Sequence, residues 1–244
     1  MTADAPGHAV AQPGSSSVEA PDYWWFAARA RLLEAALAPY LGRPTRVLDV
    51  GSADGPSAAW MRGAHTHVAV DLDVRGLTAG HGVVGALPQL PFESGSFDVV
   101  AAFDVVEHCE SEADAVADLA RVLASGGRLL VSVPAYQWAW SQHDVRAGHH
   151  RRYTRPRIVA AIEKAGLTVE RATYAFAAVF PFFAAERVLR RRPRAQRLPT
   201  VSPVADRLLR GLCAAEAKVL PRVDLPFGSS VLVAATKPAA QGQP

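Results

Sequence analysis

The stretch VLDVGSADG, residues 47–55, joins an apolar strand to a loop with a glycine near each end. Backbone that needs glycine at two places usually runs close against a bound molecule, because a side chain there would collide with it. Asp49 stands shortly before Gly51, and Asp71 follows Gly51 by twenty residues, at the end of the next apolar run. The stretch predicts a cofactor loop after the first strand of a sheet.

The composition is that of a globular domain large enough to bury its own core. Half of the 244 residues are hydrophobic (50%), 20% are charged, and the net charge of +3 is too small to indicate nucleic-acid binding. The two cysteines, Cys109 and Cys213, offer no disulfide framework and favour a reducing compartment. We therefore expect a cytoplasmic protein with no nucleic-acid partner.

Short apolar runs alternate with helical patterns along most of the chain. The runs predict strands at 46–50, 67–71, 97–103, 127–133, 167–174 and 229–237. A helix is expected from Asp22 to the stop at Pro44, another from a Ser111 cap, and a third over 154–166. Strands that are apolar throughout, without alternation, are typical of a parallel sheet covered on both faces. The pattern predicts a doubly wound α/β fold.

Three cofactors can be tested against the loop. A phosphate-binding loop would end in Gly-Lys-Ser/Thr, whereas residues 55–57 read Gly-Pro-Ser. A nicotinamide or flavin site would require glycine at Ala53, and Asp54 would repel the pyrophosphate. S-adenosylmethionine (SAM) has no phosphate, and its ribose diol and ammonium suit the carboxylates of Asp71 and Asp49. The loop favours SAM.

Further motifs extend this interpretation over most of the chain. The segment LPFESGSFDVVAAFDVVEH (90–108), the strand GGRLLVSVP (126–134) and the segment 153–169 follow the loop in order. Together with the loop they resemble the class I SAM-dependent methyltransferases over roughly residues 22–174 and the final strand. The resemblance implies a Rossmann-like, mostly parallel seven-stranded sheet whose last strand is antiparallel, with a helical insertion before it.

The resemblance also implies which residues contact SAM. They are Asp49, Gly51, Ser52, Gly55, Asp71, Leu72, Leu87, Phe103 and Asp104, with Trp25 and Arg29 as a lid from the N-terminal helix. Where many relatives place an Asp on the adenine amino group, this chain reads Gly85-Ala86-Leu87, so that contact is missing or made by backbone. For Asp98, at the start of a strand, a structural role is the better interpretation.

The segment after the fifth strand of the resembled fold, 135–153, is expected to line the acceptor pocket. It is rich in aromatic residues and histidines, and a base oriented by an acid could be built from His143 and Asp144, or from His150. The sequence therefore predicts O-methylation of a small-molecule or lipid-linked acceptor, with histidine-assisted deprotonation. No metal is expected, because the acid-rich residues 107–114 are assigned to a helix start.

The expected organisation is a disordered tail (1–21), a SAM-binding core (22–174), a helical insertion on the acceptor side (175–228), the final strand (229–237) and a flexible tail (238–244). The insertion could be a helical cap whose phenylalanines complete the core. Alternatively, its phenylalanines and the arginines of 187–197 could bind the anionic inner face of a membrane. Two other functions stay open: a non-catalytic SAM-fold partner subunit and a nicotinamide-dependent oxidoreductase.

Overall fold

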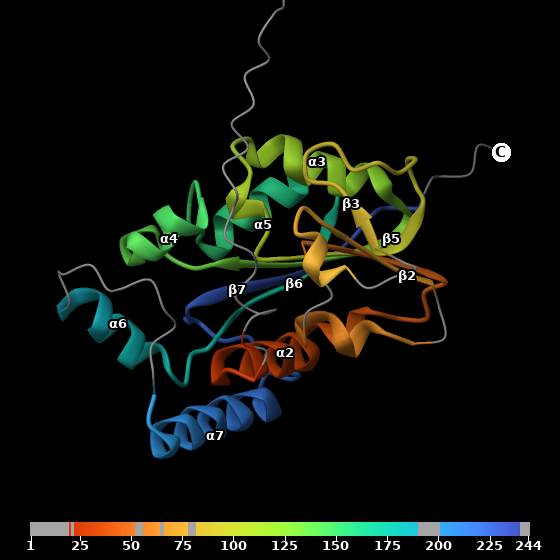
Figure 1. Ribbon diagram of the computed structural model, residues 1–244. Helices are drawn as coiled ribbons and strands as arrows, with labels where there is room; N and C mark the ends of the chain where they lie inside the picture. Colours follow the sequence, from red (N-terminus) through yellow and green to blue (C-terminus); the bar gives the residue numbers. More distant parts are fainter. Residues whose placement is uncertain are drawn as a thin grey trace, which may run out of the picture.

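The computed structural model describes residues 20, 22–51, 56–63, 66–77, 82–189 and 201–239. Its centre is a seven-stranded sheet with the strand order β3-β2-β1-β4-β5-β7-β6 (Figure 1). The strands are β1 Arg46–Val50, β2 Thr66–Asp71, β3 Gly82–Val84, β4 Phe97–Phe103, β5 Leu123–Pro134, β6 Thr168–Ala175 and β7 Ser230–Thr236. All neighbouring pairs are parallel except those of β7, which is antiparallel to β5 and β6. The predicted doubly wound sheet with an antiparallel last strand is confirmed.

Helices cover both faces of the sheet. They are α2 Trp24–Leu37, α3 Glu112–Val122, α4 Gln142–Ala147, α5 Arg155–Lys164, α6 Phe180–Leu189 and α7 Pro203–Val219, with 3-10 turns η1 Ala38–Tyr40, η2 Pro56–Met61, η3 Val74–Gly76, η4 Val106–His108 and η5 Gln137–Ala139. In Figure 1, α3 and α5 lie above the sheet, and α2 and α7 lie below it.

Each face of the sheet has its own hydrophobic core, because side chains alternate along the strands. Leu48 and Val50 of β1 pack in the core beneath α3 and α5. Val47 packs in the other core with Leu33 of α2 and Cys213 of α7. The loops at the strand ends therefore start from a sheet that is packed on both faces.

Most predicted elements lie within two residues of their observed bounds, and β1 and β4 agree at both ends. The first helix is shorter than predicted: α2 ends at Leu37, well before Pro44. Pro39 explains the early end, since it forces the chain into the turn η1. The fourth predicted strand begins earlier, at Leu123, and pairs irregularly with β4 over its first residues.

The chain between β6 and β7 forms two helices with different surroundings. Pro181 lies in the first turn of α6, so it begins a helix and does not kink one. Phe176 precedes this helix and is buried, with its ring stacked on Trp25. Helix α7 packs against α2, and its Glu216 accepts a hydrogen bond from the Ala178 backbone N–H at 2.8 Å. Within the described residues, no helix has the length and apolarity to cross a membrane.

The close approach of β6 and the start of β7 depends on Gly228. A Cβ atom at this position would overlap the backbone carbonyl of Ala175. We predict that Gly228→Ala lowers the free energy of unfolding by about 1–3 kcal/mol or more, measured by denaturant titration. The control is Gly211→Ala in α7, where a Cβ meets nothing within 4 Å. It should stabilise the protein by roughly 0.5–1 kcal/mol, and equal effects of the two variants would contradict the assigned contact.

Candidate functional site

The carboxyl ends of the parallel strands form the candidate site. The strand order reverses between β1 and β4, and ligands of doubly wound sheets bind outside the strand ends at such a point. Asp104, Tyr136 and Phe176, which follow β4, β5 and β6, have φ of 57°, 63° and 64°, and are the non-glycine residues of the described chain with positive φ. Such backbone is costly for residues with a side chain and is concentrated at functional sites.

Gly51 fixes the first loop at this reversal point. Its φ is 71°, its N–H donates to the Val70 carbonyl at 2.7 Å, and an added Cβ would come within 2.5 Å of Val105. The loop therefore starts in contact with the residue that follows Asp104, and only glycine fits there. The predicted contacts Ser52 and Gly55 lie outside the described residues.

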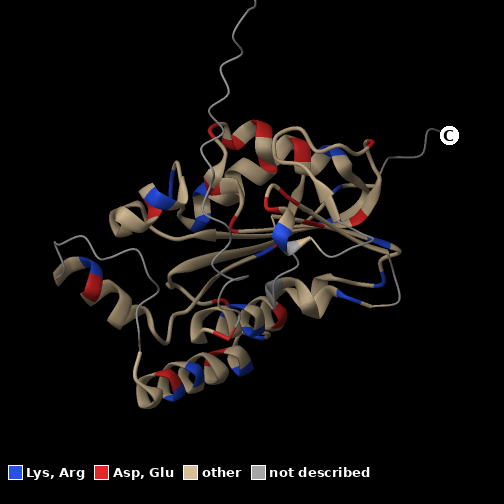
Figure 2. Cartoon of the chain, viewed as in Figure 1, with Lys and Arg blue, Asp and Glu red and all other residues tan. Residues whose placement is uncertain are grey.

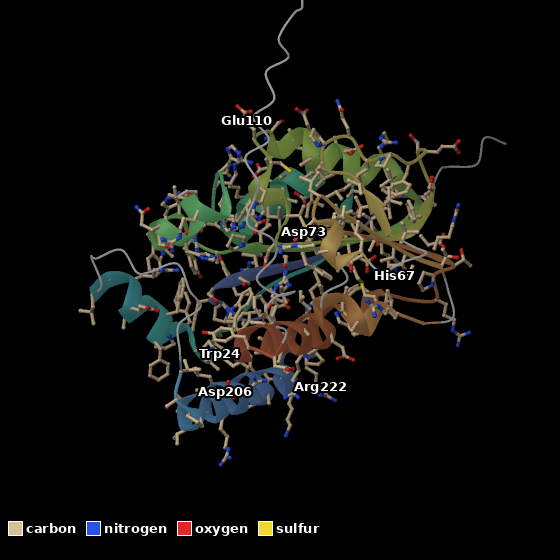
Figure 3. All side chains as sticks on the ribbon, in the orientation of Figure 1. Trp24, His67, Asp73, Glu110, Asp206 and Arg222 are labelled. Atoms are coloured by element: carbon tan, nitrogen blue, oxygen red, sulfur yellow. The ribbon has the colours of Figure 1, made fainter. Side chains whose placement is uncertain are left out.

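The two acids of the cofactor prediction lie on neighbouring strands. Asp49 is 1% exposed, and its carboxylate is 3.9 Å from His67 Nε2. Figure 3 labels His67 on β2, away from α6 and α7. Asp71 ends β2 and accepts a hydrogen bond from the Asp73 N–H at 2.8 Å, while the next side chain, Leu72, is 60% exposed. A carboxylate therefore lies beside an exposed apolar side chain at the carboxyl end of β2.

Asp104 links three elements at the end of β4. Its carboxylate accepts from Arg29 Nε of α2 at 2.9 Å and from the Ser132 hydroxyl of β5 at 2.9 Å. The Arg29 guanidinium lies 5.6 Å from the ring centre of Trp25, and that ring stacks on Phe176 at 5.8 Å. The head of α2, where Figure 3 labels Trp24, is thereby attached to the strand ends.

Two predicted contacts belong at least in part to the core. Phe103 is 6% exposed and packs in the core between the sheet and α2, and its ring centre is 6.3 Å from that of Trp60. Leu87 is partly buried against the other core.

The structural interpretation of Asp98 is confirmed, because its carboxylate accepts from Thr45 N, Thr45 Oγ1 and Arg46 N at 2.8, 2.6 and 3.0 Å. These bonds, that of the Thr45 hydroxyl above all, lower the pKa of Asp98.

The predicted pairing of His143 with Asp144 is wrong. Asp144 is fully buried and accepts from His149 Nδ1 at 2.9 Å and from Arg152 at 2.7 and 3.1 Å. Asp144 also accepts from the Ser141 N–H and hydroxyl at 2.8 and 3.0 Å, which caps the start of α4. The reason is Gly148, whose φ of 73° turns the chain back so that His149 meets the acid.

Burial opposes the charge of Asp144, but the hydrogen bonds from His149 and Arg152 outweigh it and hold the pKa of the carboxyl well below its usual range. A charged Asp144 fixes the tautomer of His149, with hydrogen on Nδ1 and a lone pair on Nε2. His150, the other predicted base, has an exposed side chain, and its backbone N–H donates to the Glu107 carbonyl at 2.7 Å.

A cluster that the sequence-based prediction missed lies beside this pair. Glu107, His108 and His149 each offer one donor atom, and these three atoms lie within 4.8 Å of one another. Glu107 is fully buried, and neither carboxylate oxygen has a hydrogen-bond partner. Burial and the charge of Asp104 raise the pKa of Glu107 well above its usual range. Loss of solvent and the nearby His149 lower the pKa of His108 to about 4.

Aromatic rings continue the strand-end surface toward α6. Tyr136 stacks on Tyr174 at 5.4 Å and on Trp138 at 5.7 Å, and its ring centre is 5.5 Å from that of Phe180. Phe227 lies 5.6 Å from Phe180. Trp138 is 53% and Phe227 is 43% exposed, so this aromatic cluster presents apolar surface to a ligand.

Comparison with known proteins agrees with this geometry. A family model described as "Methyltransferase domain" matches residues 23–172, more than half of the chain. The chain therefore belongs to the methyltransferase domain family. Membership confirms the predicted resemblance to SAM-dependent methyltransferases.

Two relatives share part of this domain. The chain is 35% identical over 115 residues to a tRNA U34 carboxymethyltransferase of Methylococcus capsulatus, covering 41% of this chain and 35% of that protein. It is 35% identical over 88 residues to a "Probable S-adenosylmethionine-dependent methyltransferase" of Mycolicibacterium smegmatis, covering 35% of this chain and 34% of that protein. The matches thus span about a third of the relatives' length, within the shared domain.

Solved structures share the fold at low identity. The [4+2]-cyclase SpnF is 17% identical with a TM-score of 0.58, and the match covers 88% of this chain and 83% of that one. A 1,6-didemethyltoxoflavin-N1-methyltransferase of Burkholderia thailandensis is 19% identical with a TM-score of 0.53, covering 91% of this chain and 84% of that one. Both likenesses establish the fold.

The buried Asp144–Arg152 pair should dominate the acid sensitivity of this region. Because the pKa of Asp144 is lowered in the folded state, its contribution is present above the unfolded value of about 4 and is lost as pH falls below it. We predict that Asp144→Asn costs about 3–5 kcal/mol of unfolding free energy at pH 7, since it leaves Arg152 buried without its partner.

The difference from the parent protein should shrink below about pH 4. The control is Asp206→Asn, which removes a partly exposed pair with Arg210 in α7 and should cost under about 1 kcal/mol. A cost for Asp144→Asn that is no larger, or that is independent of pH, would show that the pair does not stabilise the fold.

Proposed function

We propose that this member of the methyltransferase domain family transfers the methyl group of SAM to an acceptor bound at the carboxyl ends of the strands. The observation that supports this most directly is the arrangement at the strand reversal. There Gly51, with no room for a side chain, adjoins the residue after Asp104, and Asp104 joins Arg29 to β5. A loop of this kind beside fixed charges suits a cofactor with a polar, zwitterionic end.

The residues present fit SAM. Asp71, at the end of β2, is placed for the ribose hydroxyls, and the exposed Leu72 beside it offers an apolar surface for the base. Asp104 with Arg29 presents opposite charges side by side, as the ammonium and carboxylate of an amino acid require. Asp49, two residues before Gly51 and 1% exposed, adds a carboxylate near the same strand end. Trp25 and Arg29 close the site from α2.

Methyl transfer from a sulfonium needs positioning above all. The acceptor atom attacks the methyl carbon in line as the carbon–sulfur bond breaks, and S-adenosylhomocysteine leaves. SAM supplies the electrophilic methyl group when bound. The protein's part is to hold the acceptor against it, for which the aromatic cluster of Tyr136, Trp138 and Phe180 offers flat apolar contacts.

An oxygen acceptor must also lose a proton. The group placed for this is the cluster of Glu107, His108 and His149, and not His143 or His150. Asp144 accepts a hydrogen bond from Nδ1 of His149, and one donor atom of His149 lies within 4.8 Å of donor atoms of Glu107 and His108. The acceptor proton would leave through this cluster, which makes O-methylation the favoured reaction.

The acceptor is proposed to be apolar or lipid-linked. Helix α6, next to the aromatic cluster, buries none of its side chains. Phe182, Val188 and Leu189 on it are 64%, 68% and 80% exposed. Figure 2 shows α6 uncharged over most of its length. Such a helix suits peripheral contact with the inner face of a membrane, and the predicted contribution of Arg190 to Arg192 lies outside the described residues.

The assignment of Asp71 can be tested by binding alone. We predict that Asp71→Ala weakens SAM binding by about 1–3 kcal/mol, because two ribose hydroxyls lose a charged acceptor. Isothermal titration measures this directly. Asp73→Ala is the matched control, since Asp73 is two residues away and holds Arg75 at the surface. Unchanged affinity in Asp71→Ala, or equal losses in both variants, would reject the ribose assignment.

The membrane proposal is tested with vesicles containing anionic lipid at low salt. We predict that the full chain co-sediments with them, and that Phe182→Glu with Leu189→Glu weakens binding at least about tenfold, because each side chain would lose its burial in the interface.

Val223→Glu is the control, because Val223 is 47% exposed and follows α7 rather than α6. No co-sedimentation of the parent chain, or equal losses in the two variants, would leave α6 as a cap on the acceptor site.

A further inference from the structure

The cluster of Glu107, His108 and His149 contains a buried carboxyl group that has no hydrogen-bond partner. Glu107 is 0% exposed, and both its oxygens lack a hydrogen-bond partner. A carboxylate in such a position must be neutralised, either by a proton or by a cation. A cation is the more specific solution, because donor atoms of two histidines lie within 4.8 Å of the carboxylate oxygen and of each other.

We propose that Glu107, His108 and His149 bind a divalent transition-metal ion of the zinc class. Two imidazoles and one carboxylate are ligands that such ions prefer, whereas magnesium and calcium favour an all-oxygen set. Three protein ligands leave a fourth position open, as in catalytic zinc sites. A tetrahedral ion holds its donors roughly 3.4 Å apart. The donor atoms, now within 4.8 Å, therefore need only a small movement.

The surroundings of His149 are those of a metal ligand. Its Nδ1 is bonded to the Asp144 carboxylate at 2.9 Å, and Arg152 holds that carboxylate in place. A carboxylate behind the distal ring nitrogen is the usual support of a metal-bound histidine, since it fixes the ring and leaves Nε2 for the ion. The side chain of His149 is 9% exposed and so has little freedom to turn away.

The two chain segments that supply the ligands are joined by one backbone hydrogen bond and by the side chain of Arg151. The His150 N–H donates to the Glu107 carbonyl at 2.7 Å, and Arg151 donates to the carbonyls of Cys109 and Glu110 at 2.7 and 2.5 Å. His149, the residue just before these two, is thereby held near Glu107 before any ion arrives. His108 loses part of its solvent but keeps an exposed edge, which gives the ion a path from solvent.

This inference revises the expectation of no metal, which rested on the acids of 107–114 forming a helix start. Ser111 does cap α3, accepting from Asp114 N at 3.2 Å, but Glu107 and His108 precede that helix in η4. The third ligand comes from the segment after α4, so no spacing in the sequence reveals the set.

If the proposed function holds, on which this one step rests, the open position receives the acceptor hydroxyl. A bound ion lowers the pKa of such a hydroxyl, its proton passes to water, and the oxygen attacks the methyl carbon. With the ion bound, His149 acts as a ligand, and loss of the proton to water replaces the direct proton transfer to the cluster that would operate without the ion. Metal binding itself does not depend on this step.

The test is titration of the full chain, freed of any affinity tag and of metal, with Zn²⁺ and with Co²⁺, whose visible absorption reports tetrahedral nitrogen and oxygen ligation. We expect one ion per chain. Glu107→Gln and His108→Ala should each weaken binding at least about tenfold. His150→Ala, an exposed neighbour outside the set, should bind as the parent does. Circular dichroism of each variant confirms that it is folded.

The parent chain binding no ion, or binding it equally in Glu107→Gln, His108→Ala and His150→Ala, would overturn the proposal. Titration with SAM in the same preparations separates the two claims. Metal binding without SAM binding would contradict the proposed function alone, and SAM binding without metal binding would contradict this inference alone.

Discussion

Strands β1 and β4 lie side by side, but the chain leaves them toward opposite edges of the sheet, and this reversal determines where a ligand can bind. The loop after β1 and the turn after β4 must then approach each other without a helix between them. Gly51 makes that approach possible, since any side chain would collide with Val105. Asp104, in a left-handed conformation, fills the remaining space with a carboxylate held by Arg29 and Ser132.

The acidic residues at this edge of the sheet differ in their exposure to solvent and in their partners. Asp104 is partly exposed and tied to Arg29, whereas Asp144 is fully buried and neutralised by Arg152. Glu107 differs from both: it is fully buried, and neither of its carboxylate oxygens has a hydrogen-bond partner. A fold tolerates such a group where it serves a ligand, because burial without compensation only destabilises. The same edge therefore offers a cofactor site and a cluster able to take a proton or an ion.

Much of the sheet could be predicted because its signals are local. The runs at 46–50 and 97–103 are apolar, bounded by turn residues, and became strands with those bounds. Asp98 was recognised as structural because it begins a strand, where its carboxylate meets the backbone of Thr45. The three-residue β3 was missed, since so short an edge strand has no periodicity to detect.

The site was harder to predict, because its pairs are made by the fold. His143 is adjacent to Asp144 in sequence, yet Gly148 reverses the chain and brings His149 to the acid instead. That glycine was a signal that could have been used. The set of Glu107, His108 and His149 has no such signal, because two turns on different strand ends must come together first.

The claim on which the account depends is that this edge binds SAM and not a dinucleotide. Isothermal titration of the full chain with SAM, and separately with NAD, tests it most directly. The account predicts saturable binding of one SAM per chain and no heat of binding with NAD. Binding of NAD without binding of SAM would contradict it.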